Sequence, residues 1–165
     1  MVLSIDTFKR IVIDYEKCVG CRICEIVCSM ENEKTINPKL SRIKVVSNYP
    51  FTDIPIVCAQ CLKAPCISVC PTEALRRNAE GIVSVNDDEC VGCGLCVNAC
   101  PLGAIFLHPE KNVAVKCNLC NGDPLCVKKC PSNALKFISL QALIGQKTEA
   151  ITKNIDLKIR EKMEN

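Results

Sequence analysis

Sixteen cysteines occur in four groups of four, and every group is built on the same frame. The first and third groups have the spacing C-x2-C-x2-C-x3-C, and the second and fourth differ from it only by a longer middle spacer. No cysteine lies outside these groups, so the fold must bring several complete sets of thiols together. The groups are Cys18, Cys21, Cys24 and Cys28; Cys58, Cys61, Cys66 and Cys70; Cys90, Cys93, Cys96 and Cys100; and Cys117, Cys120, Cys126 and Cys130.

This spacing is typical of ligands to iron-sulfur clusters. Three thiolates from one tight loop can hold three irons of a 4Fe-4S cluster, and a fourth from a neighbouring segment completes it. Three of the groups end in the Cys-Pro step that belongs to this pattern, at Cys70-Pro71, Cys100-Pro101 and Cys130-Pro131. We therefore predict four 4Fe-4S clusters, with all sixteen cysteines as metal ligands.

The similarity between the groups continues beyond each proline. The segments 71–75, 101–105 and 131–135 all read P-x-x-A followed by Leu or Ile, which indicates that one unit has been repeated. The first group departs from it, because Cys28 is followed by Ser29 and no early Ala-Leu. Its four ligands are nevertheless complete.

Two other interpretations of the cysteines are disfavoured. A disulfide-stapled secreted domain would need a signal peptide, but polar residues interrupt any apolar run in residues 1–17. Zinc is the stronger rival, since C-x2-C pairs also suit a tetrahedral site. Zinc modules usually combine two such pairs, however, rather than four cysteines in one run that ends in proline.

An enzymatic active site is not visible in the sequence. The only histidine, His108, stands beside Pro109 in an expected hairpin turn, where an ordinary turn role is a better explanation than a ligand role. There is no G-x-G-x-x-G, Walker or G-x-S-x-G motif. Since no group is short of a thiolate, no cluster is expected to have an open iron. We expect a non-catalytic protein.

Composition agrees with a protein that is stabilised by its clusters. In 165 residues the aromatic content is 4% and there is no Trp, which is poor material for a large apolar core. Metal binding should then supply folding free energy, and the apo-protein should be largely unfolded. The formal charge of +3 would become about −5 with four clusters of about −2 each. The sequence therefore gives no reason to expect nucleic acid binding.

Apolar alternation predicts short strands between the cysteine loops, with short helices beginning near the fourth cysteine of each group. The resulting fold class is α+β, with two bacterial-ferredoxin-like two-cluster units and a C-terminal helix. The expected strands are 10–14, 42–46, 81–85, 104–107, 112–116 and 136–139, with 104–107 pairing with 112–116 through the turn 108–111. The expected units are 8–50 with 110–139 (outer), 51–109 (inner) and 140–165 (amphipathic helix).

Over residues 8–139 the chain resembles the four-cluster electron-transfer subunits of molybdenum and tungsten oxidoreductases and some hydrogenases. The resemblance rests on all sixteen cysteines, and it implies that the last cysteine of each group crosses to the cluster of a partner group. The implied ligand sets are Cys18, Cys21, Cys24 and Cys130; Cys117, Cys120, Cys126 and Cys28; Cys58, Cys61, Cys66 and Cys100; and Cys90, Cys93, Cys96 and Cys70.

Within that family, the run from Cys18 to Ser29 with Pro38 and Ser41-Arg42-Ile43 is similar to small subunits of tungsten-containing aldehyde oxidoreductases. Related small subunits of hydrogenases linked to carbon monoxide dehydrogenase or to formate share much of it. The resemblance implies a large catalytic partner with a tungsten or molybdenum cofactor. No twin-arginine leader and no apolar run near 20 residues is visible, so we expect a cytoplasmic protein without a membrane anchor.

The tail after Leu140 has an amphipathic pattern, with Ile144, Ile151, Ile155 and Ile159 at helical spacings. Packing on the protein's own cluster unit is favoured over docking to a partner. A membrane-surface helix is least favoured, because acids are interspersed with the basic residues.

The function that we expect is an electron relay between a catalytic subunit and a soluble acceptor such as ferredoxin. A free polyferredoxin and a cluster-delivery factor are the alternatives. Hydrogen bonds to sulfur and local charge would tune the potentials. The candidate amide donors are Gly20, Gly92 and Gly94, whose glycines also suit tight turns, and the candidate charges are Lys17, Arg22, Glu25 and Lys116.

Overall fold

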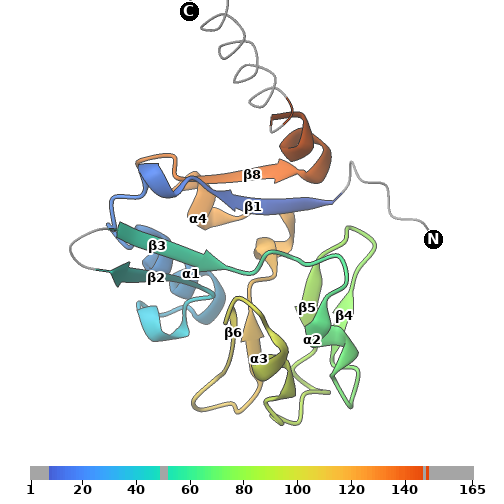
Figure 1. Ribbon diagram of the computed structural model, residues 1–165. Helices are drawn as coiled ribbons and strands as arrows, with labels where there is room; N and C mark the ends of the chain where they lie inside the picture. The colour runs from blue at the N-terminus through green and yellow to red at the C-terminus, as the bar shows by residue number, and fades with distance from the viewer. Residues whose placement is uncertain (1–7, 49–51, 147, 149–165) are drawn as a thin grey trace, which may run out of the picture.

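The computed structural model describes residues 8–48, 52–146 and 148, and it consists of short helices and short strands around the cysteine loops (Figure 1). The expected mixture of helix and strand is therefore confirmed. The strands are β1 (Lys9–Ile13), β2 (Ile43–Asn48), β3 (Thr52–Val57), β4 (Leu75–Arg77), β5 (Val83–Val85), β6 (Ile105–Leu107), β7 (Ala114–Lys116) and β8 (Leu135–Ser139). The helices are α1 (Ile23–Glu33), α2 (Pro65–Ser68), α3 (Leu95–Ala99) and α4 (Leu125–Lys128).

The described strands form four two-stranded antiparallel sheets. β1 pairs with β8, so the two ends of the cysteine-containing region lie side by side (Figure 1). The expected hairpin through residues 108–111 is confirmed, with Ile105 opposite Lys116 in the β6–β7 pair. β3 and β4, which pair with β2 and β5, are not among the strands expected from the sequence.

The prediction that helices begin near the fourth cysteine was wrong. Each helix begins one residue before the third cysteine and, except for α1, ends before the fourth. The residue before α1, α2 and α3 has a positive φ, at Arg22, Ala64 and Gly94 respectively, so the loop ends in a left-handed turn that starts the helix.

The Cys-Pro steps explain where the short helices end. A proline disfavours helical conformation in the residue before it and lacks the N–H that would continue the helix. α2, α3 and α4 all end one or two residues before a Cys-Pro step. Ser29 stands in that position in the first group, and α1 accordingly runs on through Cys28 to Glu33.

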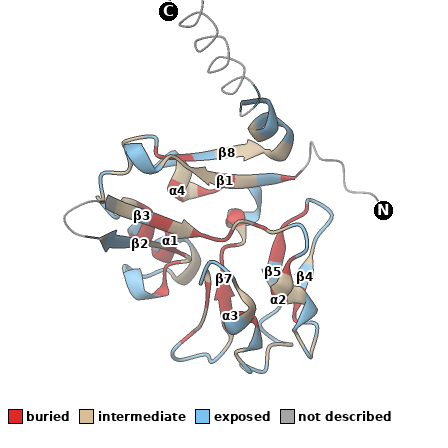
Figure 2. Cartoon of the chain, in the orientation of Figure 1, coloured by how far each residue is buried: buried red, intermediate tan, exposed pale blue. Residues whose placement is uncertain are grey.

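Apolar side chains pack around the cysteines in two clusters. Figure 2 marks the buried residues along the chain in red. The first contains Ile11, Ile43 and Leu119 and includes cysteines of the first, second and fourth groups. The second contains Leu75 and Val83 and includes Cys66 and Cys96 of the second and third groups. The apolar core is thus divided in two, and each part is built against thiols.

The expected unit boundaries, after residues 50 and 109, fall in the connections of the β2–β3 and β6–β7 hairpins. The division into two units therefore stays a prediction. Residues 140–146 and residue 148 are helical. The rest of the expected C-terminal helix, including Ile151, Ile155 and Ile159, lies outside the described residues.

Candidate metal centres

The four cysteine groups begin with the same backbone turn. The second residue after the first cysteine has a positive φ in every group, whether or not it is a glycine. From this position the amide of Gln60 donates to Cys58 Sγ at 3.4 Å, and that of Leu119 donates to Cys117 Sγ at 3.4 Å. The turn thus aims an amide at a thiol. The four residues are Gly20, Gln60, Gly92 and Leu119.

At two of these turns glycine is favoured by close contacts as well as by the positive φ. A Cβ on Gly20 would lie 2.0 Å from a carboxylate oxygen of Asp53, and one on Gly92 would lie 2.2 Å from the carbonyl oxygen of Asn112. A segment from elsewhere in the chain therefore covers each loop closely. The expected conformational role of these glycines is confirmed by the positive φ, while their amides remain predicted donors.

One hollow is lined by three cysteines of the second group and the last cysteine of the third. α2 and its preceding loop carry the first three, and Cys100 follows α3. The remaining walls are mainly apolar, with Val83 and Ile105 among them, and Lys116 also lines the hollow. The second-group thiols are those of Cys58, Cys61 and Cys66.

A second hollow has the reciprocal composition. It is lined by three cysteines of the third group, Cys90, Cys93 and Cys96, together with Cys70, the last of the second group. The structure therefore brings together the two thiol sets that the resemblance implied for the inner groups. Four sulfur donors that line one hollow suit a 4Fe-4S cluster.

The first and fourth groups approach each other in the same manner. Burial raises the pKa of Cys24 to about 12, and Glu25, Cys21 and Cys130 add to this as neighbouring negative charges. Cys130 of the fourth group thus lies near the thiols of the first. Cys28 in turn lies close enough to three fourth-group thiols for its negative charge to raise their pKa values. These are the thiols of Cys117, Cys120 and Cys126.

Burial raises the pKa of several of these thiols, to about 12 for Cys117. Deprotonation without a cation would place negative charge in an apolar surrounding, which is unfavourable. A metal that binds the thiolates removes this penalty and releases protons. The donor set therefore fits a metal-containing group.

The repeated P-x-x-A segment encloses the cysteine that precedes it. Ala104 N donates to Cys100 Sγ at 3.4 Å. Burial alone would raise the pKa of Cys70, but hydrogen bonds from the Leu75 amide and the Thr72 hydroxyl lower it. The pKa of Cys130 is likewise lowered, against the effect of burial, by hydrogen bonds from the Ser132 hydroxyl and the Leu135 amide. The residue before the alanine has a positive φ in each copy, at Glu73, Gly103 and Asn133. The repeat is visible in the sequence, but its hydrogen bonds to the preceding cysteine were not predicted.

Other hydrogen bonds to sulfur come from residues outside the cysteine loops. Cys28 Sγ accepts from Arg42 N at 3.3 Å and from Asn32 Nδ2 at 3.6 Å, and Cys90 Sγ accepts from Ala114 N at 3.3 Å. None of these donors was anticipated. Asn32 lies one turn after Cys28 in α1, whereas Arg42 precedes β2 and Ala114 begins β7, so their positions are set by strand pairing.

The thiol sets lie in a sequence from one to the next. Cys24 of one outer set lies close enough to Cys126 of the other for its negative charge to raise the pKa of Cys126. Cys117 of that set is a neighbour of Cys58, which lines the first hollow. Cys66 of the first hollow is a neighbour of Cys96 of the second.

Only two of the sixteen cysteines are exposed, and they belong to the two ends of this sequence. Cys21 and Cys93 are exposed, and the other fourteen are buried or half-buried. Val19 and Val91, which stand at equivalent positions in the same two loops, are exposed by 66% and 62%. Each of the two outermost thiol sets therefore contains one exposed cysteine.

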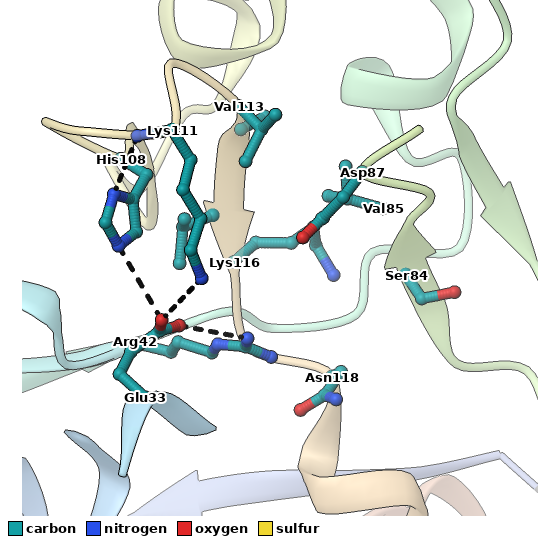
Figure 3. Close-up of a pocket in the computed structure, with 12 residues that line it drawn as sticks. Glu33, Arg42, Ser84, Val85, Asp87, His108, Lys111, Val113, Lys116 and Asn118 are labelled. Carbon is teal, nitrogen blue, oxygen red and sulfur yellow. Dashed lines mark hydrogen bonds and ion pairs between the residues drawn. The ribbon is translucent and has the colours of Figure 1, made fainter. Parts of the chain in front are cut away.

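A polar pocket lies between α1 and the β6–β7 hairpin (Figure 3). His108 is 4% exposed, and its Nδ1 accepts from the amides of Glu110 and Lys111 at 3.2 Å. Its Nε2 lies 3.6 Å from Glu33. This confirms the expected turn role of the histidine. No group of three His, Cys, Asp or Glu side chains among the described residues has the spacing needed for a single metal ion.

Two 4Fe-4S protein families match the part of the chain that contains the cysteine loops. Residues 50–140 match the 4Fe-4S dicluster domain, and residues 15–31 match the 4Fe-4S binding domain. Among the described residues, no helix has the length and apolar character that a membrane span requires.

Several curated proteins are similar to about half of the chain. The polyferredoxin-like subunit of aliphatic sulfonate oxidoreductase from Pyrococcus furiosus is 45% identical over 85 residues, covering 51% of this chain and 49% of that protein. The iron-sulfur subunit of arsenate respiratory reductase from a Shewanella species is 41% identical over 87 residues, 50% of this chain and 37% of that protein. The electron transfer subunit of thiosulfate reductase from Salmonella typhi is 37% identical over 89 residues, 48% of this chain and 45% of that protein.

The aligned part of the chain therefore spans about half the length of these relatives or less. Among solved structures, one polypeptide of the active site complex of benzoyl coenzyme A reductase as isolated is 25% identical, with a TM-score of 0.47. The match covers 90% of this chain and 99% of that one.

Proposed function

This protein belongs to the 4Fe-4S dicluster domain family, and from this premise we propose that it is the electron-transfer subunit of an oxidoreductase complex. It would relay single electrons through four 4Fe-4S clusters between a catalytic subunit and a soluble acceptor. The observation that carries this proposal is the reciprocal composition of the two hollows, in which each set of three thiols has the last cysteine of the other group beside it. When bound, such clusters supply one-electron redox chemistry.

We propose that every cysteine is a ligand and that the last cysteine of each group crosses to its partner group. The lining of the two hollows supports this for the inner groups, and the neighbours of Cys24 and Cys126 support it for the outer ones. The proposed sets are Cys18, Cys21, Cys24 and Cys130; Cys117, Cys120, Cys126 and Cys28; Cys58, Cys61, Cys66 and Cys100; and Cys90, Cys93, Cys96 and Cys70.

In the order in which their thiols adjoin, these sets would form a single path. Its ends would be at Cys21 and Cys93, the two exposed cysteines. The exposed Val19 and Val91 beside them offer the apolar contact that protein partners commonly use. One end would face the catalytic subunit and the other the soluble acceptor.

The catalytic partner implied by the sequence resemblance is a tungsten-containing aldehyde oxidoreductase, with ferredoxin as the acceptor and the cytoplasm as the location. The relatives belong to complexes named for sulfonate, arsenate and thiosulfate, and their names differ too much to support one substrate. A hydrogenase or formate dehydrogenase subunit and a free polyferredoxin are the alternatives.

Anaerobic purification from the organism that makes the protein tests this proposal. We expect a large subunit to copurify, to contain tungsten, and to reduce this chain when an aldehyde is added. Molybdenum in the partner, or reduction by formate or hydrogen, would favour the alternative complexes. A loaded chain that purifies alone and exchanges electrons with unrelated enzymes would instead be a free polyferredoxin.

A further inference from the structure

Lys116 is a buried cation placed between two of the thiol sets. It is the last residue of β7 and is 3% exposed, although lysine is rarely buried without a partner. Its Nζ donates to the carbonyl oxygen of Cys117 at 2.9 Å and also to that of Val83 in β5. Figure 3 shows the side chain extending from β7 towards β5, away from Glu33. The ammonium is therefore held in a fixed place.

Gln60 reinforces this placement. Its side chain is 1% exposed and bonds to the same two residues, donating to the Cys117 carbonyl at 2.9 Å and accepting from Val83 N at 2.9 Å. Lys116 and Gln60 thus bridge β5 to the start of the fourth cysteine group. The position of the charge is set by two strands and a buried amide rather than by a flexible side chain.

None of the ion pairs among the described residues includes Lys116. A buried charge without an opposite charge is costly, yet Lys116 lines the hollow formed by Cys58, Cys61, Cys66 and Cys100. Its charge also favours the thiolate forms of Cys66 and Cys117. The negative partner that its surroundings offer is therefore the metal-bound thiolates of these two sets.

We propose that Lys116 raises the reduction potentials of the two central clusters, those of the sets containing Cys66 and Cys117, relative to the two clusters at the ends. This inference rests on the proposed function. An added electron makes a cluster more negative, and a fixed positive charge nearby in an apolar surrounding stabilises that reduced form. Lys116 is a positioning residue for charge, since it is not itself a ligand. It would favour the presence of the electron on the two central clusters.

The test compares Lys116→Gln, Lys116→Arg and the control Lys63→Gln in the fully loaded chain. Lys63 carries the same charge in the second cysteine group, but it is exposed to solvent. Redox titration at one pH, followed by electron paramagnetic resonance, measures each cluster's midpoint potential. In Lys116→Gln we expect the equilibrium constant for reduction to fall roughly tenfold at two clusters, which is about 59 mV each for a one-electron couple. Lys116→Arg and Lys63→Gln should keep the wild-type potentials.

Three results would overturn the inference. Unchanged potentials in a fully loaded Lys116→Gln, or an equal shift at all four clusters, would show that the charge does not act on the central sets. Loss of iron in both Lys116 variants would make this lysine a structural residue only. Iron and sulfide counts on the wild-type chain separate these outcomes from failure of the proposed function, because only that failure would leave the wild type without clusters.

Discussion

Glu33 Oε2 accepts a 3.0 Å hydrogen bond from Lys111 Nζ, 78 residues further along the chain. Arg42 and His108 also lie within 3.6 Å of the same carboxylate, whose side chain is 8% exposed (Figure 3). This contact ties the end of α1 to the turn between β6 and β7. Burial by itself would raise the pKa of Glu33, but Lys111, Arg42 and His108 together lower it.

We expect Glu33→Gln to weaken the loaded protein at neutral pH. A carboxylate whose pKa is lowered by folding stabilises the folded state above its ordinary pKa, and this contribution is lost as the pH falls through the folded value. The rate at which guanidinium bleaches the cluster absorbance should therefore rise about two- to fivefold at pH 7. The difference from wild type should close at a pH where Glu33 is protonated.

Asp123→Asn provides the control for this experiment. Asp123 also forms an ion pair with a lysine, Lys128, but both side chains are more than half exposed. Exposed pairs contribute little, so the bleaching rate should stay near wild type. Equal effects of the two substitutions, or an effect of Glu33→Gln that is the same at acid and neutral pH, would contradict the role given to Glu33.

Gly92→Ala should disable one cluster site. The new Cβ would lie 2.2 Å from the Asn112 carbonyl oxygen, at a residue whose φ is +68°. Either the loop or the β6–β7 turn must move, and the set containing Cys93 should lose its cluster, about four irons per chain. Gly145→Ala is the control, because nothing lies within 4 Å of the added atom. A full iron count in Gly92→Ala would show that the loop tolerates the strain.

Pairs of cysteine substitutions test the crossing of the last ligand. If Cys70 and Cys93 bind one cluster, the double change to alanine should remove only that cluster, about four irons. The matched pair Cys100 and Cys93 would then affect two clusters and remove about eight. The opposite pattern in the iron counts would mean that each group holds its own cluster.

The cysteine frame was enough to predict what the chain binds, because a thiol at fixed spacing in a tight loop depends on local geometry alone. The β6–β7 hairpin was also predictable, since its apolar alternation flanks a short turn. Helix starts were misplaced because positive φ at Arg22 and Ala64 has no signal in residue type. The burial of Lys116 and Glu33 depends on contacts between distant segments, and a single sequence does not reveal those.

Hydroxyl groups beside the crossing cysteines should raise the potentials of the two end clusters. Thr72 lies 3.8 Å from Cys70 Sγ, and Ser132 lies 3.6 Å from Cys130 Sγ. A hydrogen bond to a thiolate favours the more negative, reduced cluster. We expect Thr72→Val and Ser132→Ala each to lower one potential by roughly 30–60 mV, since such bonds contribute about 0.5–1.5 kcal/mol.

Thr35→Val serves as the control for these variants, because Thr35 is exposed and lies in the loop between α1 and β2. Redox titration should leave its potentials at their wild-type values. If Thr72→Val and Ser132→Ala shifted the same cluster, the assignment of Cys70 and Cys130 to opposite ends of the path would be wrong.

The measurement that tests the central claim most directly is the count of iron and acid-labile sulfide per chain after anaerobic purification. Four clusters on sixteen thiolates require about sixteen irons and about sixteen sulfides. A count near eight of each would mean that only one pair of groups binds clusters. Zinc bound without sulfide would contradict the account outright.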